Sequence, residues 1–194
     1  HDIETVFYPI ALTDIVEIVK AKGELSTLTT SGRPVDCPVE KNLVMKAYRS
    51  LEKEFNLPPV DIYLRKNIPD GAGLGGGSSD AASVMLILNE MFMLNLSKEE
   101  LAQRAARLGA DCAFFIYNTP MMATGIGDIL SPTEVQLKGK TLLLVKPNVS
   151  VPTAVAYSRV TPKPSDIELT NILSQPIAEW KNLLKNDFAP SVFA

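Results

Sequence analysis

The N-terminal part of the chain alternates hydrophobic and polar residues with the period of two that predicts β-strands. Ile3–Phe7 and Asp14–Lys20 follow this pattern, and Leu25–Thr30 is rich in β-branched residues before a turn at Ser31–Pro34. These three segments predict an antiparallel meander. A further strand is predicted at Val60–Lys66, where the alternation is clear.

Other segments place their hydrophobic residues three and four apart, which predicts helices. Asn42–Phe55 has one such apolar face, and Ser79–Met93 predicts a buried helix with Ser79 as its first residue or N-cap. Ser97–Leu108 opens with a capping box in which Ser97 is the N-cap and Glu100 the third residue. Ile177–Leu184 predicts a last helix.

The order of these elements indicates the fold class and a division into two domains. Helices and strands are mixed without a regular βαβ rhythm, so an α+β fold is favoured over a doubly wound sheet. We expect a domain boundary near Lys138–Lys140, between domains at residues 1–140 and 141–194. The second domain would open with a fully apolar strand at Thr141–Val145.

Composition and charge exclude several classes of function. With 46% hydrophobic and 21% charged residues, the chain has the balance of a globular protein. A net charge of −3 argues against a nucleic-acid partner, although a phosphorylated small molecule needs only a few local groups. Cys37 and Cys112 form neither a disulfide framework nor a zinc motif, which favours a reducing cytoplasm. No apolar run has the ~20 residues of a membrane span, and no signal peptide is evident.

The segment Gly71–Ser79 carries the strongest chemical signal, with five glycines and two serines between a predicted strand and a predicted helix. Glycines allow positive φ and let backbone N–H groups approach a ligand closely. A helix that follows such a loop aims its free N–H groups and its positive dipole end at that ligand. Phosphate is the ligand that suits this arrangement best.

Other readings of the loop are weaker. The P-loop motif requires a lysine, and none lies between Lys66 and Lys98. Gly71–Gly76 matches the dinucleotide fingerprint G-x-G-x-x-G, but Glu90, at the spacing of its acidic residue, falls inside the predicted helix. A purely structural loop and a dehydrogenase therefore remain minor alternatives.

The stretch from Pro69 to Ala82, P-D-G-A-G-L-G-G-G-S-S-D-A-A, resembles the phosphate loop of the GHMP kinases. Three further segments resemble this family in the same order along the chain, and together the resemblance covers essentially all of it. They are His1–Phe7, Leu108–Phe115 and Lys146–Thr153. Two residues depart from the family pattern, since Asp70 and Ala113 stand where an uncharged residue and a proline are usual. Asp70 is expected to point to solvent.

The resemblance implies a fold and a reaction. The fold would be a ribosomal-protein-S5-like N-terminal domain followed by the start of a ferredoxin-like domain. Within the family, the chain looks most like the kinases that phosphorylate the 2-hydroxyl of a cytidine-diphosphate-linked methylerythritol in the non-mevalonate route to isoprenoids. Alternatives are a homoserine or mevalonate type of kinase, or a nucleotide-binding module without catalysis. The implied cofactors are ATP and Mg²⁺, in a cytoplasmic monomer or homodimer with no membrane or nucleic-acid partner.

The resemblance also assigns roles to residues of this chain. Asp111 would be the general base, against the alternative that it merely caps the next element. Ser79 is a candidate Mg²⁺ ligand. The ATP site would comprise Asn42, Lys66, Pro69, Asp70, Gly71, Ala72, Gly73, Leu74, Gly75, Gly76, Gly77, Ser78 and Ser79. The substrate site would comprise His1, Pro152, Thr153 and Tyr157, with His1 reading the cytosine edge and Tyr157 stacking on the base.

The resemblance further implies that catalysis uses groups outside these 194 residues. The family pattern has a lysine shortly before the position of His1 and a second glycine-rich segment after that of Ala194. We therefore expect residues 1–194 on their own to bind nucleotide weakly and to have little or no activity.

Overall fold

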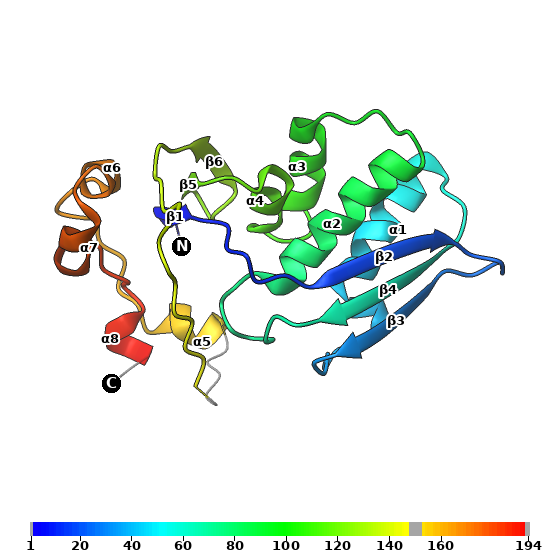
Figure 1. The fold of residues 1–194 in the computed structure, drawn as a ribbon, viewed down its shortest axis with the longest axis horizontal. Helices are drawn as coiled ribbons and strands as arrows, with labels where there is room; N and C mark the ends of the chain where they lie inside the picture. The colour runs from blue at the N-terminus through cyan, green and yellow to red at the C-terminus, as the bar shows by residue number, and fades with distance from the viewer. Residues whose placement is uncertain (1, 148–152, 193–194) are drawn as a thin grey trace. The chain divides into compact units, whose positions relative to one another are not determined.

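The computed structural model describes residues 2–147 and 153–192, which form two compact units (Figure 1). The larger unit is Tyr8–Thr119. The smaller unit combines residues 2–7 with the described residues from Pro120 onward. Among all the described residues, no helix is long and apolar enough to cross a membrane.

The larger unit is built on a three-stranded sheet with β4 (Val60–Lys66) in its centre. On one side β4 pairs antiparallel with β2 (Ile15–Lys20), and on the other it pairs parallel with β3 (Thr27–Gly32). The predicted strands are therefore present, but the predicted meander is wrong because β2 and β3 do not pair with each other. The reason is burial: Val60, Ile62 and Leu64 are almost fully buried, which favours β4 as the central strand.

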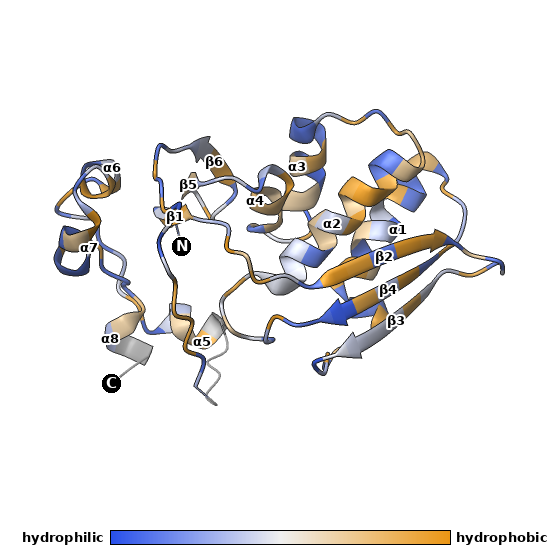
Figure 2. Cartoon of the chain, viewed as in Figure 1, coloured by the Kyte–Doolittle hydropathy of each residue, from blue (hydrophilic) through white to orange (hydrophobic). Residues whose placement is uncertain are grey.

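Four α-helices complete this unit: α1 (Leu43–Phe55), α2 (Gly76–Met91), α3 (Lys98–Ala106) and α4 (Cys112–Tyr117). A 3-10 turn, η1 (Val39–Lys41), precedes α1. Figure 2 shows hydrophobic residues along β2 and in the middle of α2. The buried face of α1 includes Tyr48 and Leu51, both with no exposed surface, and it packs against α2. The predicted capping box at Ser97 and Glu100 is confirmed.

Helix α2 begins at Gly76, so the prediction that Ser79 opens this helix is wrong. Gly75 is the N-cap, with φ 64 and ψ 23, and the amide of Ser79 already donates an intrahelical hydrogen bond to Gly75 O at 2.8 Å. Serine is common at N-caps because its hydroxyl can accept a bond from the first turn, but here a left-handed backbone ends the loop. That conformation favours glycine.

The smaller unit contains a second three-stranded sheet, in the order β1 (Thr5–Phe7), β5 (Met121–Thr124) and β6 (Ile129–Pro132), with antiparallel pairing throughout. Four short helices follow: α5 (Thr153–Ser158), α6 (Leu169–Leu173), α7 (Ile177–Leu183) and α8 (Ala189–Val192). The last predicted helix, Ile177–Leu184, is thus confirmed to within one residue.

The predicted strand at Thr141–Val145 is wrong for the structure as described. Residues 141–147 lie outside helix and strand, and Leu143 is 84% exposed. An apolar run can form a strand only where a neighbouring strand accepts its hydrogen bonds. No described residue pairs with this segment.

Candidate functional site

The glycine loop encloses a hollow of about 260 Å³ in the larger unit. Every residue from Pro69 to Ser78 lines it, together with Lys66 from the end of β4 and Leu43 from the start of α1. Gly71, Gly73 and Gly75 all have positive φ, between 60 and 68. The backbone therefore alternates through a conformation that residues with a Cβ rarely adopt, so that the loop can curve around the hollow.

The hollow opens at the N-terminus of α2. No side chain of the described residues caps that terminus. The N–H groups of the first turn are thus available to a ligand, and the helix dipole adds positive potential at the same place. A negatively charged group such as a phosphate satisfies both requirements.

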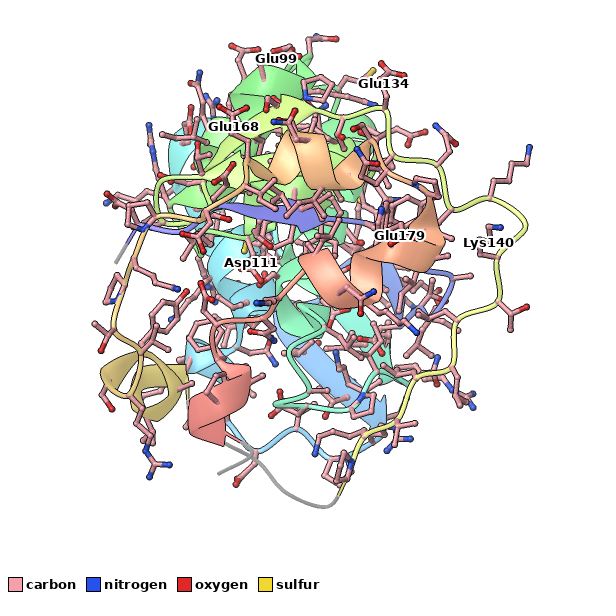
Figure 3. All side chains as sticks on the ribbon, turned by 90° about the vertical axis from the view of Figure 1, so that its left-hand side faces the viewer. Glu99, Asp111, Glu134, Lys140, Glu168 and Glu179 are labelled. Atoms are coloured by element: carbon pink, nitrogen blue, oxygen red, sulfur yellow. The ribbon has the colours of Figure 1, made fainter. Side chains whose placement is uncertain are left out.

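Asp111, labelled in Figure 3, lies beside this loop. Its Oδ1 accepts a hydrogen bond from the hydroxyl of the buried Ser78 at 2.8 Å. A Cβ added to Gly75 would lie 3.3 Å from Asp111 Oδ2, so the second carboxylate oxygen faces the same turn of the loop. The structure therefore brings a carboxylate, a hydroxyl and the loop backbone to one place.

Asp111 occupies the N-cap position of α4, where a carboxylate often only satisfies the first turn. Its side chain makes no such capping bond to an amide of the described chain. Both carboxylate oxygens are directed at the glycine loop instead. This geometry argues against the alternative that Asp111 is only a helix cap.

Cys112 follows Asp111 but is not arranged as a nucleophile. Its side chain is buried. Burial raises the pKa of the thiol to about 11, with a further contribution from the Asp111 charge, although Ser78 opposes the shift. The thiol is protonated near neutral pH and serves as a small core residue.

A buried cluster of charges lies at the other end of the loop. Lys66 Nζ donates to Asp80 Oδ2 at 2.7 Å and to Asp14 Oδ2, and all three side chains are at least 92% buried. Asp14 Oδ1 also accepts hydrogen bonds from the amides of Asn67 at 2.5 Å and Ile68 at 2.8 Å. The cluster therefore joins the residue before β2, the end of β4 and the first turns of α2.

The three pKa values follow from burial and these contacts. Burial raises the pKa of Asp80 to about 6, with Lys66 opposing and Asp14 adding to the shift. Burial also acts to raise the pKa of Asp14, but hydrogen bonds from Lys66, Ile68 and Asn67 outweigh it and leave that pKa below its usual value. Burial acts to lower the pKa of Lys66, and the two carboxylates outweigh it and raise that pKa.

Sequence reasoning did not single out Asp14 or Asp80. Asp80 stands inside the motif that suggested a phosphate loop, so its place after the two serines was a usable signal. Asp14 carries no local signal. Its role depends on strand register: Ile15 pairs with Arg65, which puts the preceding residue, Asp14, next to Lys66.

The remaining predicted residues are placed as follows. Asn42 is the N-cap of α1, with Oδ1 accepting from the amide of Val44 at 2.9 Å, and it precedes Leu43 of the hollow. Asp70 is exposed, as expected.

Tyr157 lies in α5 of the smaller unit, where its ring packs edge-on against Phe188 with centroids 4.9 Å apart. Thr153 begins α5, while His1 and Pro152 lie outside the described residues.

Among residues 2–147 and 153–192, no group of three or more His, Cys, Asp or Glu side chains is arranged to hold a metal ion. The hydroxyl of Ser79, the predicted metal ligand, belongs to the first turns of α2, one residue beyond those that line the hollow.

Comparison with protein families matches residues 42–119 to the N-terminal domain of the GHMP kinases. This range lies within the larger unit and contains the loop and Asp111. The chain is 53% identical to a 4-diphosphocytidyl-2-C-methyl-D-erythritol kinase of Bacteroides fragilis over the whole chain and 71% of that relative. It is 45% identical to the kinase of the same name from Cytophaga hutchinsonii, over the same shares.

Solved structures give the same result. A crystal structure of 4-(cytidine 5'-diphospho)-2C-methyl-D-erythritol kinase matches the whole chain and 69% of its own length, with a TM-score of 0.73 and 30% identity. A homoserine kinase from Cytophaga hutchinsonii matches 93% of the chain and 64% of its own length, with a TM-score of 0.57 and 18% identity. This second likeness concerns the fold.

Proposed function

This chain belongs to the GHMP kinases, among the 4-diphosphocytidyl-2-C-methyl-D-erythritol kinases, and we propose that it transfers the γ-phosphoryl group of ATP to the 2-hydroxyl of 4-diphosphocytidyl-2-C-methyl-D-erythritol. The reaction yields ADP and the 2-phosphate of the acceptor. It belongs to the non-mevalonate route to isoprenoid precursors. The observation that carries the proposal is the Asp111 carboxylate beside the glycine loop.

The loop and the N-terminus of α2 would hold the phosphates of ATP. Gly71, Gly73 and Gly75 let the backbone amides turn toward the hollow, and α2 directs its uncapped first turn there. Phosphoryl transfer proceeds largely through positioning and electrostatic stabilisation, so a rigid set of amide donors is the main contribution that this part of the chain makes.

Asp111 would act as the general base. Its Oδ1 is held by Ser78, which leaves Oδ2 to accept the proton of the 2-hydroxyl as that oxygen bonds to the γ-phosphorus and the bond to ADP breaks. The hydroxyl proton moves to Oδ2, and the electron pair of the breaking bond stays on ADP.

The other end of the nucleotide would lie toward Lys66. This lysine lines the hollow, but two carboxylates more than neutralise its charge. The cluster of Lys66 and its two carboxylates therefore offers no net electrostatic attraction to a triphosphate. An N–H donor within a cluster of zero or negative net charge suits the uncharged adenine ring better. Asn42 would also lie near the adenine end of the nucleotide, because the next residue, Leu43, lines the hollow.

Mg²⁺ would enter with ATP, bound mainly by phosphate oxygens and water, with the Ser79 hydroxyl as its candidate protein ligand. When bound, it neutralises charge that develops on the phosphates.

The substrate's cytidyl end would be held by His1, Pro152, Thr153 and Tyr157. We also propose a division into domains at residues 1–140 and 141–194. An oligomeric state of monomer or homodimer is likewise a proposal.

The acceptor can be tested with the complete protein, including any segments that flank residues 1–194, by measuring ADP release with 4-diphosphocytidyl-2-C-methyl-D-erythritol, mevalonate and homoserine side by side. We expect release only with the cytidyl acceptor. ADP release with homoserine or mevalonate alone would identify another kinase of this family. ATP binding without ADP release from any acceptor would indicate a nucleotide-binding module.

A further inference from the structure

The glycine loop is held at both of its ends by the same buried charges. Lys66 is the last residue of β4, with four residues between it and the loop, and Asp80 lies in the first turns of α2, directly after Ser79. Their ion pair, at 2.7 Å between Nζ and Oδ2, closes the loop at its base. Asp14 fixes the first loop residues by accepting from the amides of Asn67 and Ile68.

A glycine-rich segment needs such support if it is to have one conformation before a ligand arrives. Glycine loses more backbone entropy on ordering than any other residue, and Gly71–Gly77 contains five of them. Asp70, Gly71, Gly73 and Gly77 are exposed, so side-chain packing orders this stretch only weakly. Fixing the two ends reduces the conformations open to the residues between them.

Stability alone does not account for a buried cluster of one lysine and two carboxylates. Burying charges carries a desolvation penalty that their attraction often fails to exceed, and apolar residues of similar size stabilise a core as well. Charged groups differ from apolar ones in being directional. Here each carboxylate oxygen that accepts a bond fixes either the lysine or a loop amide.

We propose that Asp14 and Asp80 are positioning residues that act through Lys66 to hold the glycine loop in the conformation that receives the nucleotide phosphates. The inference rests on the proposed function of that loop as an ATP site. Neither carboxylate touches the nucleotide in this account. Their effect is to lower the entropy that ATP binding must remove from the loop.

The test is to compare Asp14→Asn and Asp80→Asn with Asp61→Asn as the matched control. Asp61 lies near the start of β4, at the opposite end of the strand from Lys66, and its Oδ1 accepts from the Thr27 hydroxyl at 2.6 Å. ATP affinity is measured by calorimetry, and the Michaelis constant for the cytidyl acceptor by ADP release. Amide hydrogen exchange of residues 67–77 is followed with and without ATP.

We expect Asp14→Asn and Asp80→Asn each to weaken ATP binding by about tenfold while the Michaelis constant of the acceptor stays the same. Exchange of the loop amides should be faster than in the wild-type protein without ATP and return to the wild-type rate at saturating ATP. Asp61→Asn should change none of these quantities. A folded Asp80→Asn protein with wild-type ATP affinity and wild-type loop exchange would overturn the inference.

One further variant keeps the test decisive. If a single variant does not fold, the triple variant Asp14→Asn, Lys66→Met, Asp80→Asn leaves no unpaired buried charge and should fold. Its loop amides should exchange faster without ATP, and an unchanged exchange rate would overturn the inference. Failure of the loop's proposed role as an ATP site is distinguishable, because the wild-type protein itself would then show no ATP binding, and failure of the proposed reaction would appear as ATP binding without ADP release.

Discussion

At the scale of single residues, the proposed catalysis depends on the two carboxylate oxygens of Asp111. One is held by Ser78 and the other faces Gly75. In the complete protein, Asp111→Asn preserves the shape of the side chain and removes its capacity to take a proton. We expect turnover to fall by roughly 10²- to 10⁴-fold, the usual contribution of a general base, with ATP affinity unchanged. Single-turnover kinetics beside calorimetry measures both, and an unchanged rate would show that Asp111 has only a structural role.

Ser78 should act on catalysis through Asp111. Ser78→Ala removes a hydrogen bond to a charged group, worth ~1.5–3 kcal/mol, and should lower turnover by roughly ten- to a hundredfold. In the Asp111→Asn background the same substitution should have little further effect, because no base remains to be oriented. The matched control is Ser50→Ala, because the Ser50 hydroxyl donates a hydrogen bond to Ala47 O within α1, away from the loop. Equal losses in both backgrounds would contradict this role.

Asp80 gives ATP binding a pH dependence of defined sign. Its pKa, raised by burial and by Asp14 against Lys66, is about 6 in the folded protein and 3.8 as a free side chain. The folded state therefore binds the Asp80 proton more tightly than the unfolded state does. The contribution of this bound proton to the free energy of unfolding is lost as the pH rises from 3.8 to about 6. The ionised form that pairs with Lys66 dominates above that window.

ATP affinity should therefore increase relative to that of Asp80→Asn as the pH rises through about 6. Calorimetry on both proteins from about pH 5 to about pH 7.5 measures the ratio of their dissociation constants, in which the titration of ATP itself cancels. A ratio that is constant across this range would refute the prediction.

At the scale of elements, the loop between β4 and α2 is the part with least tolerance for side chains. A Cβ on Gly75 would lie 2.6 Å from Phe115 Cζ, at a residue with φ 64. Gly73 has a similar φ of 68, but no atom of a described residue beyond its two chain neighbours lies within 4 Å of its Cβ position. A side chain at Gly75 would therefore cause both steric overlap and backbone strain, whereas a side chain at Gly73 would cause backbone strain alone.

Gly75→Val should abolish detectable ATP binding while the protein remains folded, since the branched side chain would displace Phe115 and the N-terminus of α2. Gly73→Ala should retain ATP binding and lose only about 1–2 kcal/mol of stability from the left-handed backbone. Calorimetry and denaturant unfolding of both variants check this. Normal ATP affinity in folded Gly75→Val would contradict the role assigned to the loop.

Periodicity in the sequence predicted most elements but not their neighbours. Val60–Lys66 was predicted with its observed bounds, because alternation reports which face is buried. Strand order was missed, since alternation carries no information on the partner, and the buried β4 lies between β2 and β3. Thr141–Val145 has strand composition without a described partner. The start of α2 was missed by three residues because a left-handed Gly75, not a serine, caps it.

At the scale of the whole chain, the candidate site divides into a part that the sequence reveals and a part that it does not. The loop could be predicted because its chemistry is local and contiguous. The contact between Asp14 and Lys66 spans 52 residues and exists only because Ile15 pairs with Arg65. Likewise, Ser78 and Asp111 are 33 residues apart and meet through the packing of α2 against α4. Contacts of this kind depend on strand register and helix packing, which no motif encodes.

The proposed reaction can be tested by following the phosphoryl group itself. The complete protein, including any segments that flank residues 1–194, is incubated with γ-labelled ATP and 4-diphosphocytidyl-2-C-methyl-D-erythritol, and the product is examined for label and by phosphorus NMR. The account predicts that the label appears in one new phosphate monoester on the 2-hydroxyl, in an amount equal to the ADP formed. Label released as inorganic phosphate, or transferred to another hydroxyl or another alcohol, would contradict it.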